Sequence, residues 1–195
     1  DRLSPSVKII ANFAVGYGNI DLDAARQRNI VVTNTPEVLD DSTADISILL
    51  LLGASRKVLE ARRAAERQNW KWSADFLLGK QMSNKRLGIL GMGRIGRAVA
   101  KRARGFNMEI HYHNRNQLPK DLEGGAIYHK KIKDLFSCSD FLSINCPATK
   151  ETNKIINKET LAFLPDNVVI GNAARGDVVD DEAMIAALKT KKVFA

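Results

Sequence analysis

The sequence is poor in cysteine and histidine, the residues that build most metal and redox centres. It has two cysteines and three histidines among 195 residues. The spacing of Cys138 and Cys146 matches neither a zinc-binding motif nor a redox pair. We therefore expect two reduced, structural thiols and no metal site.

A long hydrophobic run is also missing. The longest apolar stretch, from Ile46 to Ala54, is interrupted by Ser47 and is too short to cross a bilayer. No signal peptide precedes the first expected strand. These observations predict a cytoplasmic protein that does not bind membranes.

Acidic residues are fewer than basic ones, 22 against 30, which gives a net charge of +8. The excess is scattered in pairs such as Arg62-Arg63 and Lys130-Lys131, and no arm concentrates it. The positive electrostatic potential that this net charge produces attracts anionic substrates and cofactors. The basic residues are accompanied neither by a nucleic-acid-binding motif nor by aromatic residues placed among them for base stacking. We therefore expect no nucleic-acid partner.

Beyond Trp72, apolar segments that resemble strands alternate with helical patterns. The expected strands are Arg86–Leu90, Met108–Tyr112, Ala126–Tyr128, Phe141–Asn145 and Val168–Ile170. This alternation predicts an α/β fold, in which helices cover both faces of a doubly wound parallel sheet of the Rossmann type.

The first part of the chain is organised differently. Strands are expected at Val7–Ala11 and Ile30–Thr33, with a glycine-containing loop and a short helix between them. A long helix is expected from about Ser42 to Gln68, because Ser42 and Asp45 have the spacing of a capping box. We expect one domain over residues 1–39 and another over residues 40–195, which includes this helix.

The most informative motif is Gly91-Met92-Gly93-Arg94-Ile95-Gly96, which lies between an apolar strand and a helical pattern. Gly91 permits a tight turn, Gly93 lets the backbone approach phosphates, and Gly96 lets the helix pack closely on the strand. The helix N-terminus then offers N–H groups to an anion. The motif therefore predicts a binding site for the pyrophosphate of a dinucleotide.

The end of the second strand of this unit bears on which dinucleotide binds. NAD-binding units place an Asp or Glu there, about 20 residues beyond the glycines, to bind a ribose hydroxyl. Here the residues are His113, Asn114 and Arg115, while Glu109 lies at the opposite end of the strand. An arginine pairs well with a 2′-phosphate, so the sequence favours NADP(H) over NAD(H). The alternative is that Arg115 is a solvated loop charge.

Two segments carry groups suited to binding an organic acid. Arg175 follows the last expected strand, so it projects from the carboxyl end of the sheet, where ligands bind in such folds. Its guanidinium would grip the carboxylate and carbonyl oxygens of a 2-keto acid, unless it is a cap or a surface ion pair. The backbone N–H groups of Val15 and Gly16 form a second candidate, a small anion-binding nest.

A convincing general acid is missing. His111 and His113 lie on or just past the second strand, beside the expected adenosine ribose. His129 follows the third strand and has no carboxylate partner close to it in the sequence. We therefore expect all three histidines to be structural or solvated.

Several motifs in fixed order resemble those of the D-isomer-specific 2-hydroxyacid dehydrogenases. They are Asn12–Asp21, Asn34–Pro36, Gly91–Gly96, Cys146–Thr152 and Asn172–Gly176. Within that family the chain is most similar to the glyoxylate and hydroxypyruvate reductases. The resemblance covers nearly the whole chain. It implies a homodimeric enzyme that reduces a small 2-keto acid to the 2-hydroxy acid with NADPH.

The resemblance also implies roles for individual residues. Arg175 would be the catalytic arginine, and the Val15-Gly16 backbone would bind the substrate carboxylate. His113 occupies the position where NAD-using members carry an aspartate, and Asn114-Arg115 is similar to the NADPH-using branch. The further residues implied to line the cofactor are Thr43, Arg94, Ile95, Cys146, Pro147, Thr152, Ala173 and Ala174.

The resemblance implies that residues 1–39 are part of a flavodoxin-like substrate domain and that residues 40–195 belong to the dinucleotide-binding domain. Family members place a glutamate and a proton-donating histidine after the strand that begins here at Val193. We therefore expect the chain to be a portion of an enzyme, inactive by itself. Two alternatives are a dehydrogenase of the lactate or phosphoglycerate type and a dinucleotide-sensing protein similar to the C-terminal-binding corepressors.

Overall fold

The computed structural model describes residues 3–67 and 70–195, which divide into two compact units, one up to Asp41 and one from Ser42 onward. The smaller unit contains β1 (Ile9–Ala11), α1 (Leu22–Gln27) and β2 (Val31–Thr33), and its two strands pair in parallel. The Asp21 carboxylate caps α1 by accepting a hydrogen bond from the Ala24 backbone N–H. This unit is therefore a small β-α-β element.

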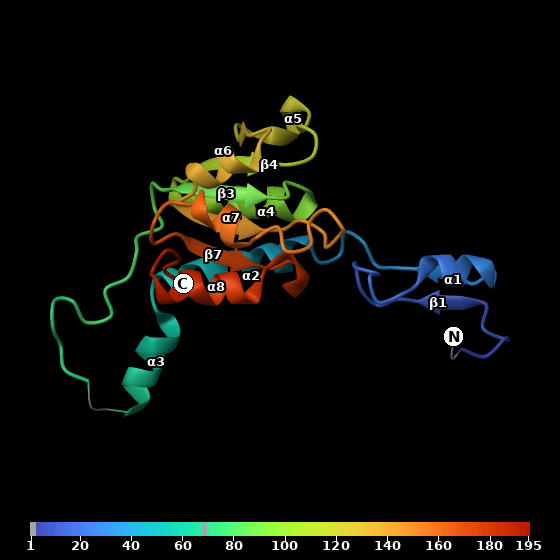
Figure 1. Cartoon of the computed structure of the whole chain (residues 1–195), viewed down its shortest axis with the longest axis horizontal. Coiled ribbons are helices and arrows are strands. Elements are labelled where there is room, and N and C mark those ends of the chain that lie inside the picture. The colour runs from blue at the N-terminus through green and yellow to red at the C-terminus, as the bar shows by residue number, and fades with distance from the viewer. Residues whose placement is uncertain (1–2, 68–69) are drawn as a thin grey trace. The chain divides into compact units, whose positions relative to one another are not determined.

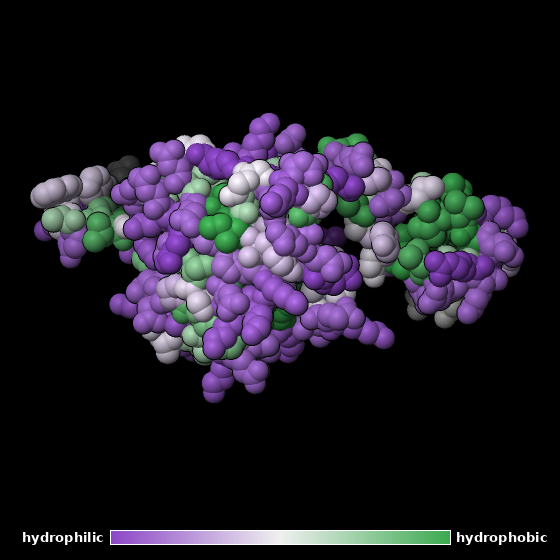
Figure 2. Space-filling view, turned by 90° about the horizontal axis from the view of Figure 1, so that it is seen from above, coloured by the Kyte–Doolittle hydropathy of each residue, from purple (hydrophilic) through white to green (hydrophobic). Residues whose placement is uncertain are grey.

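Hydrophobic side chains are exposed on the smaller unit, and Figure 2 shows them gathered on its surface. Phe13 is 97% exposed and Val38 is 78% exposed. Two strands and one short helix have too little surface to bury both faces of a sheet. An apolar surface of this kind is typical of a contact face in a larger assembly.

The larger unit contains a five-stranded sheet. Its strands are β3 (Arg86–Leu90), β4 (Glu109–His113), β5 (Ile127–Tyr128), β6 (Phe141–Ile144) and β7 (Val169–Asn172). All neighbours are parallel, in the order β5-β4-β3-β6-β7. This order is that of a dinucleotide-binding fold, with its switch point between β3 and β6. The predicted doubly wound parallel sheet is confirmed.

Helices cover this sheet on both faces (Figure 1). They include α2 (Asp40–Ser55), α4 (Arg94–Ala103), α6 (Ile132–Ser137), α7 (Lys158–Ala162) and α8 (Asp181–Lys189), with the shorter α5 (Lys120–Glu123), η1 (Arg104–Phe106) and η2 (Gly176–Val178) between them. Leu87 and Ile89 pack with α2 and α4 in one hydrophobic cluster. Leu90 and Ile144 pack with α6, α7 and α8 in the other. Successive strand residues point to opposite faces, so the nearly continuous apolar strands of this sheet supply both clusters.

The single long helix that the sequence predicts is two helices, α2 and α3 (Val58–Arg67), and its expected last residue, Gln68, lies outside the described residues. Lys57, between the two helices, has φ of +53°, a left-handed conformation that ends a helix. The cause is a tertiary contact, because the Ser55 carbonyl accepts a hydrogen bond of 2.7 Å from the Lys80 N–H. The sequence near Lys57 carries no sign of a partner so distant in the chain.

The expected capping box at Ser42 is also wrong. Helix α2 begins at Asp40, so Ser42 lies inside its first turn. Farther along the chain, α3 leads away from the sheet and buries none of its own residues (Figure 1). Across the described ranges, no helix combines the length and the apolarity needed to span a bilayer.

Candidate dinucleotide site at the carboxyl edge of the sheet

The glycine turn follows β3 at the switch point of the sheet. Gly91 has φ of +97°, and a Cβ atom there would lie 2.6 Å from the Cys146 backbone nitrogen. A Cβ on Gly96 would overlap the Gly91 carbonyl oxygen. In contrast, a Cβ on Gly93 would meet no described atom within 4 Å. The fold itself therefore requires Gly91 and Gly96, whereas Gly93 faces open space at the start of α4.

The end of β4 supports this turn. The Asn114 side-chain Oδ1 accepts a hydrogen bond of 2.7 Å from the Met92 N–H, and the His113 carbonyl accepts one of 3.0 Å from the Gly91 N–H. The His113 Nδ1 lies 2.8 Å from the carbonyl oxygen of His129, so Nδ1 is the protonated ring nitrogen. Asn114 and His113, both predicted to bind the cofactor, thus also shape the backbone that would hold it.

Arg115 follows them in an exposed bend. Its charge reaches Glu151, which lies in the loop after β6. The pKa of Glu151 is lowered mainly by a hydrogen bond from the Thr149 hydroxyl and to a smaller extent by Arg115. Arg115 is thus an exposed residue just past the carboxyl end of β4, the strand end beside which a ribose would lie in this fold.

The loop after β6 lies beside the glycine turn, because the Asn145 N–H donates to the Leu90 carbonyl at 2.8 Å. The Thr152 hydroxyl closes this loop by donating to the Pro147 carbonyl at 2.6 Å and accepting from the Thr149 N–H. Cys146 is buried, and burial raises the pKa of its thiol. The thiol is therefore protonated at neutral pH.

These features fit a bound dinucleotide. Asn145 Oδ1 is buried at the switch point and has no hydrogen-bond partner among the described residues. Gly93 leaves space at the N-terminus of α4, where no side chain caps the helix. A helix N-terminus without a side-chain cap, beside open space, suits a pyrophosphate. Arg94 and Ile95 lie in the first turn of α4, and Thr43 lies in the first turns of α2.

The loop after β7 holds Arg175. The Asn172 side chain accepts a hydrogen bond of 2.9 Å from the Ala174 N–H and donates one of 2.8 Å to the Arg175 carbonyl. The Arg175 guanidinium is exposed and donates to the Ala174 carbonyl at 2.9 Å. Ala173, also predicted to line the cofactor, donates its N–H to the Ile144 carbonyl. Sequence reasoning did not single out Asn172, although asparagine is the residue that most readily forms such a turn.

The strand register brings these loops to one edge. Leu90 pairs with His113 on one side and with Ile144 on the other, and Ile144 pairs with Asn172. The glycine turn, the Cys146 loop and the Arg175 loop therefore start in one row at the carboxyl end of the sheet. That edge is where ligands bind in doubly wound folds.

Val15 and Gly16 belong to the smaller unit. Their carbonyl oxygens accept hydrogen bonds of 2.9 Å from the side-chain amides of Asn34 and Asn12, respectively. Asn12 also donates to the Ala14 carbonyl at 3.4 Å. Two asparagines thus orient the peptide groups of the loop that was predicted to bind a carboxylate.

His111 and His113 belong to β4, and His129, just after β5, contacts both of them. His111 Nδ1 is 2.9 Å from His129 Nε2, and Cys138 Sγ is 3.7 Å from the same nitrogen. His111 is buried, and this burial is the main reason that its pKa is lowered. A neutral imidazole at neutral pH does not supply a proton, so His111 is unsuited to be a general acid.

The strand order, the glycine turn and the loops at the carboxyl edge define a Rossmann dinucleotide-binding domain. Residues 48–195 match the family model described as "D-isomer specific 2-hydroxyacid dehydrogenase, NAD binding domain". The chain belongs to this family, as its motifs predict.

Among curated relatives, the chain is 44% identical to a glyoxylate reductase of Thermococcus kodakarensis, covering 95% of this chain and 57% of the relative. It is 39% identical to a glycerate dehydrogenase of Hyphomicrobium methylovorum, over 99% and 61% of the two chains. A solved glyoxylate reductase from Paecilomyes thermophila superposes with a TM-score of 0.86 at 44% identity, over 98% and 57% of the chains. The chain thus spans less than two thirds of the length of these relatives.

Proposed function

We propose that the full-length protein reduces glyoxylate or hydroxypyruvate to the corresponding 2-hydroxy acid, with NADPH as the hydride donor. The observation that carries this proposal is the exposed Arg175, whose backbone carbonyl accepts a hydrogen bond from Asn172 at the sheet edge that also carries the glycine turn. The similarity to proteins named glyoxylate reductase and glycerate dehydrogenase supports the substrate class.

In this proposal the protein binds and orients two anions. The N–H groups at the start of α4 and the open backbone at Gly93 hold the pyrophosphate. Arg175 holds the substrate carboxylate and stabilises the negative charge that develops on the keto oxygen. The family resemblance implies that the backbone N–H groups of Val15 and Gly16, in the smaller unit, also bind a carboxylate. The bound nicotinamide supplies the hydride.

The proton would come from a residue other than these three histidines. His111 and His129 contact each other, and His113 is bonded through Nδ1 to a backbone carbonyl. We propose the glutamate-supported histidine that the family resemblance implies. On this basis residues 1–195 alone would bind the dinucleotide and would not turn over.

The role of Arg175 is tested by Arg175→Ala in the full-length protein. We expect kcat/KM for glyoxylate to fall by about 10²- to 10³-fold or more, because a preorganised charge at the oxyanion is lost. Arg175→Lys should recover only part of the activity, since an ammonium group cannot bind both oxygens in a fork. Steady-state rates measure this, and near-normal turnover of Arg175→Ala would contradict the role. Rates with hydroxypyruvate, pyruvate and phosphohydroxypyruvate would identify the preferred acid.

The choice of dinucleotide is tested by Arg115→Asp. This change removes a partner for the 2′-phosphate and adds one for a ribose hydroxyl, so NADPH binding should weaken about tenfold or more while NADH binding is spared or improved. Arg63→Asp on α3 is the matched control, because it makes the same change of charge at another exposed arginine. Dissociation constants of both dinucleotides decide the question. An unchanged preference in Arg115→Asp would make Arg115 a surface charge only.

A further inference from the structure

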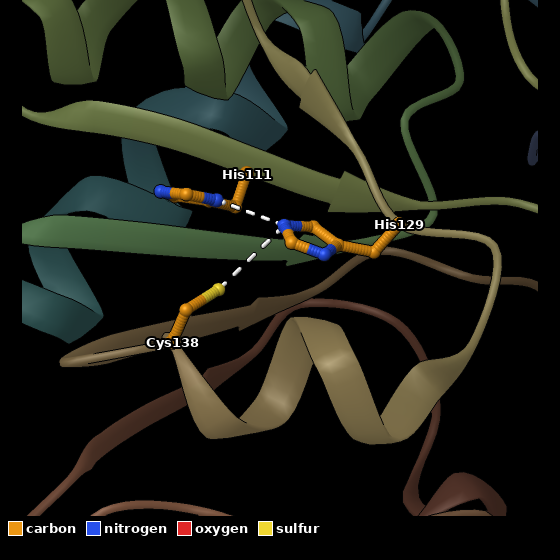
Figure 3. Close-up of side chains that lie close together, drawn as sticks. All are labelled: His111, His129 and Cys138. Atoms are coloured by element: carbon orange, nitrogen blue, oxygen red, sulfur yellow. Dashed lines mark hydrogen bonds between the residues drawn. The ribbon is translucent and has the colours of Figure 1, made fainter.

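A cluster of metal-ligating side chains lies outside the sheet edge described above. His111 in β4, His129 after β5 and Cys138 after α6 have donor atoms that all lie within 4.8 Å of one another (Figure 3). Figure 3 shows the His129 ring to one side of the other two side chains, with Nε2 facing both. Three elements of the fold therefore bring together two imidazoles and a thiol.

We propose that His111 Nδ1, His129 Nε2 and Cys138 Sγ bind a zinc ion. A tetrahedral zinc site requires about 3.3 Å between two ligating nitrogens and about 3.6 Å between a nitrogen and a sulfur, given the usual bond lengths. The structure has 2.9 Å between the two nitrogens and 3.7 Å between His129 Nε2 and the sulfur. The donor atoms of His111 and Cys138 lie within 4.8 Å of each other, and Cys138 Sγ donates to the Leu135 carbonyl at 3.1 Å. Zinc binding would therefore replace the thiol proton and move these side chains by up to about 1 Å.

The surroundings of His111 point to the same ligand. His111 is 6% exposed, and its Nε2 is buried with no hydrogen-bond partner among the described residues. The Glu109 Oε1 lies 2.9 Å from this nitrogen, so a proton on Nε2 would be donated to this carboxylate. Metal binding through Nδ1 would fix the proton on Nε2, beside Glu109. A histidine that ligates a metal commonly donates its other N–H to a carboxylate in this way.

The charges also balance. A zinc ion carries two positive charges, and the Cys138 thiolate and Glu109 supply two negative ones. The cation that most affects Cys138 is Arg86, and its guanidinium is already bonded to both carboxylate oxygens of Asp140, at 2.9 and 3.0 Å.

The backbone holds each ligand in place. The His129 N–H donates to the Tyr112 carbonyl at 2.8 Å, and the Cys138 N–H donates to the Leu135 carbonyl at the end of α6. His111 lies in the middle of the paired strand β4. The proposed ion would therefore join β4, the residue after β5 and the end of α6, and should raise the melting temperature of the domain.

The test uses full-length protein stripped of metal with a chelator, incubated with Zn²⁺ and separated from free ion. We expect about one zinc per chain in the wild type, because the three ligands form one site. Retention should fall at least tenfold in Cys138→Ser and in His129→Gln. Cys146→Ser, which removes the other thiol, should retain zinc as the wild type does. No zinc on the wild type, or equal retention by Cys138→Ser, would overturn the proposal.

Two measurements on the wild type do not depend on the folding of any variant. Cobalt in place of zinc should give a charge-transfer band of a thiolate ligand and the ligand-field bands of a tetrahedral site. Zinc should also protect Cys138 from alkylation, read by mass spectrometry of its peptide against that of Cys146. A cobalt spectrum without thiolate bands, or alkylation of Cys138 at the same rate with and without zinc, would overturn the assignment. Neither measurement requires catalysis. The zinc proposal can therefore be judged even if the protein lacks the proposed reductase activity.

Discussion

At the residue scale, the Asn172 side chain determines where Arg175 lies. Its amide accepts from the Ala174 N–H and donates to the Arg175 carbonyl, so both of its polar atoms hold the turn after β7. The Arg175 side chain contributes only one bond to this turn, to the Ala174 carbonyl. Asn172 is therefore a positioning residue, and its effect on the reaction would pass through the guanidinium.

We expect Asn172→Ala to lower kcat by about 10- to 100-fold, because a displacement of about 1 Å at a catalytic group has an effect of this size. The dissociation constant of NADPH should change little, since the glycine turn is intact. Asn172→Asp keeps an acceptor for the Ala174 N–H but loses the donor to Arg175, so it should be intermediate. Steady-state kinetics and NADPH titration separate these effects. A parallel loss of cofactor affinity would indicate a general structural role.

At the scale of the element, the β3-turn-α4 segment uses its three glycines in two ways. Gly91 and Gly96 are required by contacts within the protein, whereas Gly93 has open space in front of it. Sequence reasoning assigns these uses from the motif alone, because each glycine serves a known step of the turn. The structure adds the neighbours that enforce two of them, the Cys146 nitrogen and the Gly91 carbonyl oxygen.

Substitution of two of these glycines should separate folding from binding. Gly93→Ala should change the free energy of unfolding by less than about 0.5 kcal/mol, because the new methyl group meets no neighbour. It should weaken NADPH binding by at least about tenfold, since it occupies the space for the pyrophosphate. Gly96→Ala should instead destabilise the domain by about 1 to 3 kcal/mol through overpacking against Gly91. Urea unfolding and NADPH titration provide the readouts. If Gly93→Ala bound NADPH as tightly as the wild type, the proposed position of the pyrophosphate would be wrong.

The strands were more predictable than the helix ends, for a physical reason. A strand buried on both faces leaves a short apolar run in the sequence, and each strand of the larger sheet lies within two residues of its predicted bounds. The break at Lys57 depends on the bond between Ser55 and Lys80, and such tertiary partners leave no local pattern. The helical periodicity of the sequence therefore predicts one continuous helix where the structure has α2 and α3.

The residues of the candidate site also differ in how well the sequence predicts them. The positions of Arg175 and the glycine turn at strand ends were predictable, because the apolar strands that precede them are visible in the sequence, and their roles stay predictions. The cluster of His111, His129 and Cys138 was not, because strand pairing and the end of α6 bring these residues together from separate segments. Their spacing matches no zinc motif, so the sequence predicts no metal site at these residues.

At the scale of the whole molecule, the two halves of the sheet meet where β3 pairs with β6. At the amino ends of these strands, Asp140 accepts two hydrogen bonds from the Arg86 guanidinium and one from the Arg86 backbone N–H. The Asp140 N–H donates in return to the Arg86 carbonyl. This pair lies at the edge opposite the dinucleotide site, so it affects stability and leaves the proposed chemistry untouched.

The bonds from Arg86 are the main reason that the pKa of Asp140 is lowered below its ordinary value of 3.8. A carboxyl group whose folded pKa is lowered stabilises the fold above its unfolded pKa, and this contribution is lost as the pH falls through the folded pKa. We expect Asp140→Asn to reduce the free energy of unfolding at pH 7 by about 1 to 2 kcal/mol, toward the low end because Arg86 is partly exposed.

The difference between Asp140→Asn and the wild type should then shrink as the pH falls below 3.8, because the wild type itself becomes protonated at Asp140. Asp166→Asn is the matched control, since Asp166 pairs with Lys192 but its side chain is 79% exposed. Its effect at pH 7 should stay below about 0.5 kcal/mol. Urea unfolding of the three proteins from pH 7 down to the acid limit of the fold measures both effects. A deficit of Asp140→Asn that is equal at all pH values would mean that packing, and not the charge on Asp140, joins the two halves of the sheet at this point.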